Sequence, residues 1–328
     1  MNGLTNLWKY NLSDHTVNQI TFGPGPDFAP MPDPSGKGIY YVNGKVSGSL
    51  ISFNVKSGVS VEISSELASQ PIVSPDGKRV LYIKILAPGK STELWVSDLD
   101  GRNAVKLASA AEISTGFWAS DSSRVTFFAK EKAGEKNRGY VVGTDGKNLV
   151  SIEPLEADIA NMVWSADGKF LYLVTQTGSS LPMIWKANSD GSGVEKFIEN
   201  CYAMEATPDG NYLICVLLSG KDVGIYQISL AEKKRMPLLP GVETFMVRMS
   251  LDRKAFLYSV AGRGEILFYR QEWRDGKLVG EPKVALKLPF AFPLAFFGNA
   301  YDFSPDLSTI VYAKPGGQAD LYFLALGS

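Results

Sequence analysis

Short apolar runs separated by turn residues recur along the whole chain. A turn of the Ser-Pro-Asp-Gly type is followed by an alternating or wholly apolar run in SPDGKRVLYI (74–83) and SADGKFLYLV (165–174). Apolar residues also precede the turn, as in Ile72-Val73. In such a turn Pro fixes φ at the first corner, Asp bonds to the neighbouring backbone and Gly tolerates a positive φ. The pattern predicts pairs of β-strands joined by tight turns.

This turn occurs seven times at a nearly constant spacing. The equivalent positions are Ser35, Asp76, Asp121, Asp167, Asp209, Asp252 and Asp306. The steps between them are 41, 45, 46, 42, 43 and 54 residues, and a period of about 40–45 residues is typical of one β-propeller blade. A third apolar run, such as LWVSDLDG (94–101), ends in a hairpin signal and leads to a fourth, such as AVKLA (104–108). Each unit therefore predicts a four-stranded sheet.

The predicted fold is all-β, a seven-bladed β-propeller of four-stranded antiparallel blades that forms a single domain over residues 1–328. A β-sandwich would not repeat its turn sequence seven times, and a parallel β-helix has a much shorter period. No segment has the periodicity of an amphipathic helix.

Counting strands predicts how the ring closes. The final unit ends at LYFLALGS (321–328), three strands in, and an open blade would expose an unpaired edge. We therefore expect the N-terminal segment 16–21 to supply the outer strand of the blade built by 301–325. Segments 7–11 and 321–326 then compete for one third-strand position, and 321–326 is favoured because its connection is short. Deletion of residues 1–22 is expected to lower the melting temperature.

The repeat resembles a known family. The SPDGK turn with the apolar residues after it (74–82) and the LW…DLDG strand (94–101) resemble the repeats of TolB-like β-propellers, a branch of the WD-repeat-like group. Similar repeats occur in periplasmic TolB, in propeller regions of prolyl oligopeptidase-like peptidases and in sensor regions of bacterial Ser/Thr kinases. The opening LTNLWKYNLSDHTVNQIT (4–21) looks most like the kinase setting. The resemblance implies the fold and a possible periplasmic or extracytoplasmic location, while function stays open.

Charge and composition exclude several classes of protein. Lys+Arg 33 against Asp+Glu 34 gives a net charge of -1, so no basic field exists to attract nucleic acid. Residues 1–20 lack the basic start and apolar run of a secretion signal. The most apolar stretch, 289–297, contains two prolines and is too short to span a bilayer. Cys201 and Cys215 form no repeating framework, and we expect two free thiols because residue 201 should lie in a connection above the strands.

Candidate catalytic chemistry is sparse. His15 is the single histidine and no GxSxG motif occurs, so a Ser-His-Asp triad has no basis. Oligogalacturonate lyases, which also resemble these repeats, hold a metal with several histidines, and one His cannot do this. Gly-Arg-Gly at 262–264 has no helix after it and is a hairpin loop. The sequence therefore predicts no catalytic residue, no metal site and no cofactor.

Acidic residues recur nine positions before the turn residue. They are Glu112, Asp158 and Glu243, with Asn200 at the same place and Asp27 and Glu66 one position away. Connections between blades share one face of a propeller, so these groups are expected around one mouth of the central channel. They serve either solubility and loop hydrogen bonding, or a site for a cation or a Lys/Arg-bearing peptide.

Aromatic residues concentrate in the same connections. The long last step contains LKLPFAFPLAFFGNAY (286–301), and Phe28, Tyr202 and Phe245 lie in equivalent connections. These rings either cap the core or form an exposed apolar patch that marks a partner site.

The function predicted is non-catalytic binding. A scaffold or sensor propeller would recognise a protein, a peptide or a small ligand through the connections 22–31, 198–205, 241–248 and 288–301. The alternative is a lactonase- or lyase-like enzyme, in which acids with Arg248 support metal-assisted chemistry, or the substrate-gating propeller of a larger peptidase. The candidate binding residues are Phe28, Glu112, Asp158, Tyr202, Glu243, Phe245, Arg248, Phe290, Phe292, Phe296 and Phe297.

Overall fold

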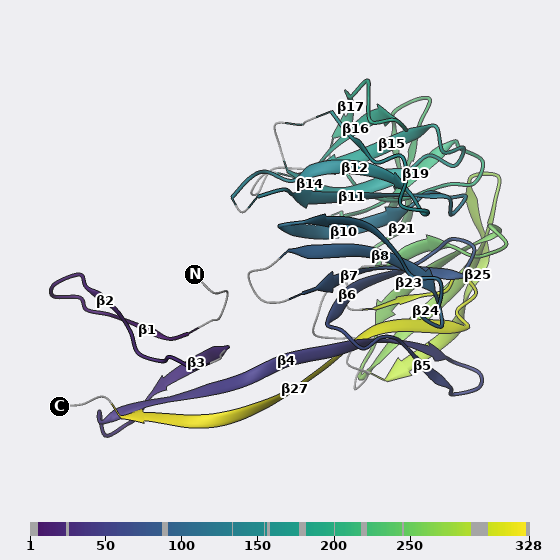
Figure 1. Cartoon of the computed structure of the whole chain (residues 1–328). Coiled ribbons are helices and arrows are strands. Elements are labelled where there is room, and N and C mark those ends of the chain that lie inside the picture. The colour runs from purple at the N-terminus through teal and green to yellow at the C-terminus, as the bar shows by residue number, and fades with distance from the viewer. Residues whose placement is uncertain are drawn as a thin grey trace.

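The structure is a computed structural model that describes residues 6–23, 26–86, 91–132, 134–153, 155, 158–176, 182–199, 201–217, 222–244, 246–289 and 301–325. Every regular element in these ranges is a β-strand (Figure 1). The predicted all-β class is therefore confirmed. No helix long and apolar enough to cross a membrane occurs in the described part of the chain.

Five of the seven predicted units form separate four-stranded antiparallel sheets, each with its strands in sequence order. Each predicted turn residue from Asp76 to Asp252 lies between the first and second strands of its sheet. The sheets are β6 (Ala68–Val73), β7 (Arg79–Ile85), β8 (Thr92–Asp98) and β9 (Val105–Ala110); β10 (Glu112–Trp118), β11 (Arg124–Lys130), β12 (Arg138–Gly143) and β13 (Val150–Ser151); β14 (Ile159–Trp164), β15 (Phe170–Thr175), β16 (Met183–Asn188) and β17 (Glu195–Glu199); β18 (Tyr202–Ala206), β19 (Tyr212–Leu217), β20 (Gly224–Ser229) and β21 (Arg235–Pro240); and β22 (Val247–Met249), β23 (Ala255–Ala261), β24 (Glu265–Arg274) and β25 (Lys277–Pro289).

Side-chain hydrogen bonds hold the repeated turn. The hydroxyl of Ser74 donates to the Asp76 carboxylate at 2.5 Å and accepts from the backbone N–H of Arg79 at 2.9 Å. The same carboxylate accepts from the N–H of Lys78 at 3.1 Å, and Gly77 takes a φ of 71°. A hydroxyl-to-carboxylate bond recurs at Ser165 and Asp167, Thr207 and Asp209, Ser250 and Asp252, and Ser304 and Asp306. The turn chemistry is thus local, which is why the sequence reveals it.

The first and last units share one sheet. β3 (Asp27–Pro32) and β4 (Gly38–Asn54) flank the turn at Ser35, whereas β26 (Tyr301–Phe303) and β27 (Thr309–Ala325) flank the turn at Asp306. The strand order is β26-β27-β4-β3, and β5 (Ser60–Ser64) also pairs with β4. β4 and β27 are 17 residues each and pair from Thr309↔Asn54 to Ala325↔Gly38. This composite sheet joins the two ends of the described chain.

Six sheets pack face to face in a ring. Six clusters of buried side chains each lie between two successive sheets. The composite sheet takes part in two of them: Leu50 packs with Tyr82 of β7, and Phe303 lies 4.4 Å from Phe268 of β24, centroid to centroid. Side-chain packing therefore closes the ring. Within the described residues the ring contains six sheets rather than the seven blades predicted, because the first and last units contribute to one sheet.

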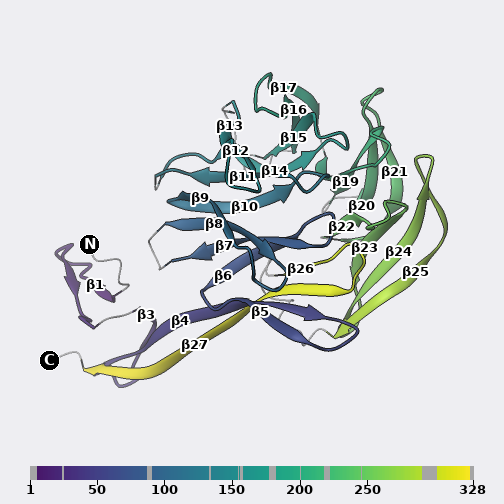
Figure 2. The same ribbon diagram turned by 45° about the vertical axis from the view of Figure 1, so that its right-hand side comes forward.

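The outer half of the composite sheet projects from the ring as an arm, which we define as residues 6–23, 26–48 and 315–325 (Figures 1 and 2). It contains β3, the adjoining parts of β4 and β27, and the hairpin of β1 (Trp8–Tyr10) and β2 (Val17–Gln19). The predicted closure by 16–21 is wrong, because β2 pairs with β1 and with no other described strand. Residues 321–325 do lie in the last sheet, as expected, but they pair with β4.

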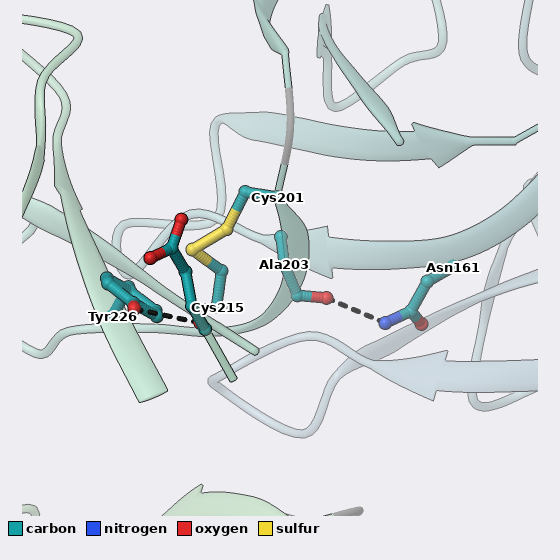
Figure 3. Close-up of a disulfide and its surroundings, with 6 residues drawn as sticks. Asn161, Cys201, Ala203, Cys215 and Tyr226 are labelled. Atoms are coloured by element: carbon teal, nitrogen blue, oxygen red, sulfur yellow. Dashed lines mark hydrogen bonds between the residues drawn. A yellow bond between two sulfur atoms is a disulfide. The ribbon is translucent and has the colours of Figure 1, made fainter. Parts of the chain in front are cut away.

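The cysteine prediction is also wrong. Cys201 and Cys215 form a disulfide with their Cα atoms 5.8 Å apart (Figure 3). β18 pairs with β19 in the register Ala203↔Cys215, so Cys201 lies beside the adjacent strand rather than above it. Both residues are fully buried between the β14–β17 and β18–β21 sheets.

Candidate functional site

The first strands of the sheets converge. β6 contacts β10 and β26, and β14 contacts β10 and β18, which in turn contacts β22. Four residues before each turn aspartate, these strands carry Ile72, Phe117, Val163, Glu205, Arg248 and Asp302. On three successive sheets this residue is apolar. On the next three sheets it is charged, as Glu205, Arg248 and Asp302.

Arg248 ties three of these strands together. Its Nη1 donates to the two carboxylate oxygens of Asp302 at 3.1 and 3.0 Å and to the carbonyl of Phe303. Its Nη2 donates to the carbonyl of Val73 at 3.1 Å, and Asp302 accepts from the N–H of Val73 at 2.7 Å. The two charged side chains are 14% and 15% exposed. Arg248, predicted as a binding residue, therefore makes an internal ion pair, and its hydrogen bonds link β22, β26 and β6.

Glu205 lies beside this network. Its side chain is half-buried on β18. Burial raises the pKa of the Glu205 carboxyl, although the positive charges of Arg253 and Arg248 and the N–H of Met249 act in the opposite direction. Sequence reasoning missed Glu205. Its place four residues before Asp209, the same as that of Arg248 before Asp252, was the signal that could have found it.

Three of the predicted acidic residues, Glu112, Glu66 and Asp158, have local partners. Glu112 pairs with Lys130 at 2.9 Å and Glu66 with Lys84 at 2.6 Å. Asp158 accepts from the backbone N–H of Asn137 at 3.3 Å, and Glu243 is exposed. Within the described ranges, no three His, Cys, Asp or Glu side chains are grouped so that they could hold a metal ion.

Asp27 lies on the arm and not beside the other acids. Burial of Asp27 favours its neutral form, but hydrogen bonds from Thr21, Asn43 and Asn6 outweigh this and lower the pKa of its carboxyl. The distances to the donors of Asn43 and Asn6 are 2.5 and 3.2 Å. His15 also lies on the arm, where its Nδ1 is 2.6 Å from the Tyr10 hydroxyl in an exposed hairpin.

The two predicted aromatic residues that the structure describes, Tyr202 and Phe28, lie in different sheets. Tyr202 is half-buried on β18, donates to the carbonyl of Ala160 at 2.9 Å, and has its pKa raised by burial. Phe28 is 41% exposed on the arm. The remaining predicted positions lie outside the described residues; they are Asn200, Phe245, Phe290, Phe292, Phe296 and Phe297.

The exposed aromatic side chains of the described chain all lie on the arm. Sequence reasoning found only Phe28 among them. They are Trp8, Tyr10, Phe22, Phe28, Tyr322 and Phe323. Concentrated exposed apolar surface of this kind marks an interaction site more often than single exposed residues do.

Register places apolar side chains on both faces of the arm sheet. Directly opposed residues share a face, and the pairs Tyr40↔Phe323 and Tyr41↔Tyr322 therefore lie on opposite faces. Their ring centroids are 5.0 and 5.6 Å apart. One face carries Phe28, Met31, Tyr40, Val42, Leu321 and Phe323, and the other carries Ile39, Tyr41, Tyr322 and Leu324.

One edge of the arm sheet is open. Over residues 315–325, β27 pairs with β4 on one side, while β26 reaches only Ile310–Tyr312 on the other. No other described strand pairs with this edge. In the five four-stranded sheets the third strand is flanked by a second and a fourth strand. Residues 320–325 are therefore a third strand without a fourth. Leu321, Tyr322 and Phe323 on it are 69%, 45% and 49% exposed.

Solved structures with the same fold were found. A TolB protein from Agrobacterium tumefaciens has a TM-score of 0.56 at 15% identity, over 83% of this chain and 99% of that one. The β-propeller domain of the Trilobed protease from Pyrococcus furiosus, described as having an open velcro topology, has a TM-score of 0.53 at 19% identity, over 79% and 82%. An oligogalacturonate lyase from Vibrio parahaemolyticus has a TM-score of 0.51 at 15% identity, over 81% and 83%.

These similarities show the fold. No protein-family model and no curated protein sequence matches the chain. The chain has the β-propeller fold of TolB-like proteins, as the repeat resemblance implied. Because the neighbours include a lyase and a protease domain as well as TolB, the fold alone selects no function.

Proposed function

We propose that this chain is a non-catalytic binding propeller that captures an extended segment of a protein partner by β-strand addition along residues 320–325 of β27. The observation that carries the proposal is the third strand without a fourth. An edge strand presents unpaired N–H and C=O groups, and an added strand satisfies them.

The other sheets indicate the length of segment that fits. In the β6–β9 sheet the fourth strand pairs with the third from Thr92↔Ala110 to Val96↔Val105. A partner segment of comparable length would cover the edge of residues 320–325 in the same way. Main-chain hydrogen bonds would supply affinity, and the side chains on the two faces would supply selectivity.

The side chains along the edge specify apolar chemistry. Leu321 and Phe323 point to one face and Tyr322 to the other, and all three are exposed. An added strand alternates its own side chains between these faces. The partner segment should therefore carry apolar residues at successive positions or on alternate positions, since cross-strand apolar pairs stabilise a sheet.

We also propose an extracytoplasmic location. The disulfide between Cys201 and Cys215 supports it, because disulfides persist mainly in oxidising compartments. Alkylation of thiols at the moment of cell lysis, followed by mass spectrometry, should find the two cysteines joined. Two alkylated cysteines in the native host would contradict this location.

The binding proposal is tested with a phage-displayed library of random linear peptides, selected on the purified protein. Enriched peptides should carry apolar residues at successive or alternate positions and should bind in solution, as measured by fluorescence anisotropy. Leu321→Lys/Phe323→Lys places two charges on the edge and should weaken binding by about tenfold or more, equal to about 1.4 kcal/mol.

The matched control is Val279→Lys/Val284→Lys, which adds the same charge to exposed positions of β25, the outer strand of another sheet. Its affinity should stay within about twofold of the parent protein, a difference below about 0.5 kcal/mol. Failure to enrich any peptide, or equal binding to both double variants, would contradict strand addition at this edge.

A further inference from the structure

β4 and β27 differ from every other second strand of the described sheets. In the five four-stranded sheets the second and third strands are separate and pair with one another, as β7 does with β8. β4 and β27 instead each continue without interruption for 17 residues, through the second-strand and the third-strand positions of their unit. Each strand therefore contains two strand positions without a turn between them.

The register between β4 and β27 pairs equivalent positions of the first and last units, so that each unit takes its partner strand from the other. Gly38 and Thr309 each lie three residues after their turn residues Ser35 and Asp306, and Asn54 and Ala325 each lie nineteen after. The structure pairs Thr309 with Asn54 and Gly38 with Ala325. The second-strand segment of each unit is thus paired with the third-strand segment of the other unit.

The same positions, three and nineteen residues after the turn residue, would also be opposite one another if the second strand of each unit paired with the third strand of its own unit. Gly38 would then face Asn54, and Thr309 would face Ala325, with reversals at 44–48 and 315–319. A similar offset is found in the β18–β21 sheet, where Tyr212 and Ser229, three and twenty residues after Asp209, are partners. No residue would change its position in a blade; only the partner would change.

Both segments that would have to reverse contain turn residues. Gly44 and Gly48 lie in the first segment, and Pro315, Gly316 and Gly317 lie in the second; these residue types favour tight turns. In the structure both lie within continuous strands. Local preference and observed pairing therefore disagree at two equivalent places, and such a disagreement marks a site with a competing arrangement.

The arm has the composition of a blade without neighbours. Sheets in the ring bury apolar side chains on both faces, against the sheet before and the sheet after. The arm sheet is apolar on both faces as well, yet Phe28, Met31, Leu321 and Phe323 on one face are exposed. Placed between two sheets, these faces would be covered.

We infer that the chain has a second arrangement, in which the first and last units each pair with themselves and the ring contains seven blades. The structure shows the exchanged arrangement, with six sheets in the ring and the seventh set of strands displayed as the arm. The inference does not rest on the proposed function. Residues 320–325 pair through one edge with the second strand of unit one, and in the other arrangement the same edge would pair with the second strand of unit seven. Their outer edge, to which the proposed partner segment binds, is open in both arrangements.

The two arrangements differ most in the distance between the ends of β4. Lys37 and Lys56 are exposed and lie just outside this strand. Nineteen residues of extended chain separate them by about 60 Å in the exchanged arrangement. In the self-paired arrangement Gly38 and Asn54 would be adjacent, which brings the two lysines within about 15 Å.

The test is pulsed electron paramagnetic resonance on full-length Lys37→Cys/Lys56→Cys carrying two spin labels, with the native cysteines joined in their disulfide. We expect two populations of distance, one long and one short. The control is Lys78→Cys/Arg102→Cys, exposed positions around the ordinary β7–β8 hairpin, which should give a single short distance.

Two results would overturn the inference. A single long distance for the Lys37→Cys/Lys56→Cys protein, at all temperatures below unfolding, would show that the exchanged pairing has no competitor. A short distance that disappears when labelled chains are diluted with unlabelled chains would assign the pairing to two copies of the chain rather than to one.

Discussion

At the scale of single residues, the Arg248–Asp302 pair is the best defined contact between first strands. Both side chains are largely buried, at 14% and 15% exposure. Arg248→Met would leave the Asp302 charge without its partner and should lower the free energy of unfolding by about 3 kcal/mol, since the loss of one member of a buried pair is strongly destabilising. Urea unfolding monitored by tryptophan fluorescence measures the change.

A matched control lies in the same sheet. Arg270 pairs with Asp252 at 3.3 Å, and these side chains are 40% and 52% exposed. Arg270→Met should cost less than about 1 kcal/mol because water screens the pair. Equal effects of the two substitutions would show that Arg248 does not hold the first strands together.

Glu205 gives stability a dependence on pH. Its pKa is raised in the folded protein, mainly by burial, so the folded state binds its proton more tightly than the unfolded state. The contribution of Glu205 to the free energy of unfolding is fully present below its ordinary pKa of 4.5. This contribution is lost as the pH rises through the pKa of Glu205 in the folded protein. Glu205→Gln should therefore be more stable than the parent protein at neutral pH and equal to it at about pH 4.

The measurement is urea unfolding of both proteins at the two pH values. Glu243→Gln, at an exposed position, is the control and should change stability at neither pH. A Glu205→Gln protein that is less stable than the parent at neutral pH would mean that the attraction of Arg253 and Arg248 outweighs burial.

The sequence predicted Arg248 as a functional residue but did not predict its ion pair with Asp302. It selected Arg248 as a candidate binding residue in the 241–248 connection, which with acids could support metal-assisted chemistry, but it could not show that Asp302 of the next sheet lies 3.0 Å from it. The partner is 54 residues away along the chain. Pairing across sheets depends on the curvature of the whole ring, which no local pattern encodes.

At the scale of elements, the disulfide fixes the start of β18 against β19. Cys201 and Cys215 are 14 residues apart in sequence, and closing a loop of this size stabilises a protein by about 3 kcal/mol. Cys201→Ala/Cys215→Ala should lose about this much free energy of unfolding. Adding a reductant should bring the parent protein to the same value and leave the variant unchanged.

A thiol titration tests whether Cys201 and Cys215 are joined. If the unreduced parent protein, once unfolded, releases two reactive thiols, the cysteines are not joined. The sequence favoured that outcome because it placed residue 201 in a connection. Cys201 does precede β18, but the register Tyr202↔Val216 and Ala203↔Cys215 brings it beside β19, close enough to Cys215 for a disulfide.

Strand positions were predictable because their signals are local. The hydroxyl and carboxylate around each turn bond within five residues, as Ser74 does with Asp76 and Arg79. The partners of residues 38–54 and 309–325 were not predictable in this way. Two units with the same offsets compete for the same pairing, and the choice between them is a property of non-local contacts.

At the scale of the whole molecule, the N-terminal hairpin is peripheral to the ring. Its strands pair only with one another among the described strands. Deletion of residues 1–23 should therefore shift the melting temperature by less than about 3 °C, equivalent to about 1 kcal/mol in a protein of this size. Differential scanning calorimetry measures it. A large decrease in melting temperature would instead support the prediction from the strand count that segment 16–21 closes the last blade.

The ring itself shows both what periodicity can predict and what it cannot. Seven turns of one type predicted a propeller, and the fold agrees. The number of sheets in the ring differs, because the units at Ser35 and Asp306 contribute two strands each to one ring sheet and leave the rest on the arm (Figure 1). Periodicity counts units, whereas ring size depends on how the first and last units are joined.

We propose that the open outer edge of residues 320–325, a third strand without a fourth, accepts a partner segment. Amide hydrogen exchange followed by mass spectrometry tests it most directly, with and without a peptide selected from the displayed library. Without peptide, residues 320–325 should exchange faster than β8, whose two edges are paired. With peptide they should become protected, while β25 stays unchanged. Exchange of 320–325 that is as slow as that of β8 before the peptide is added, or that the peptide does not alter, would contradict the claim.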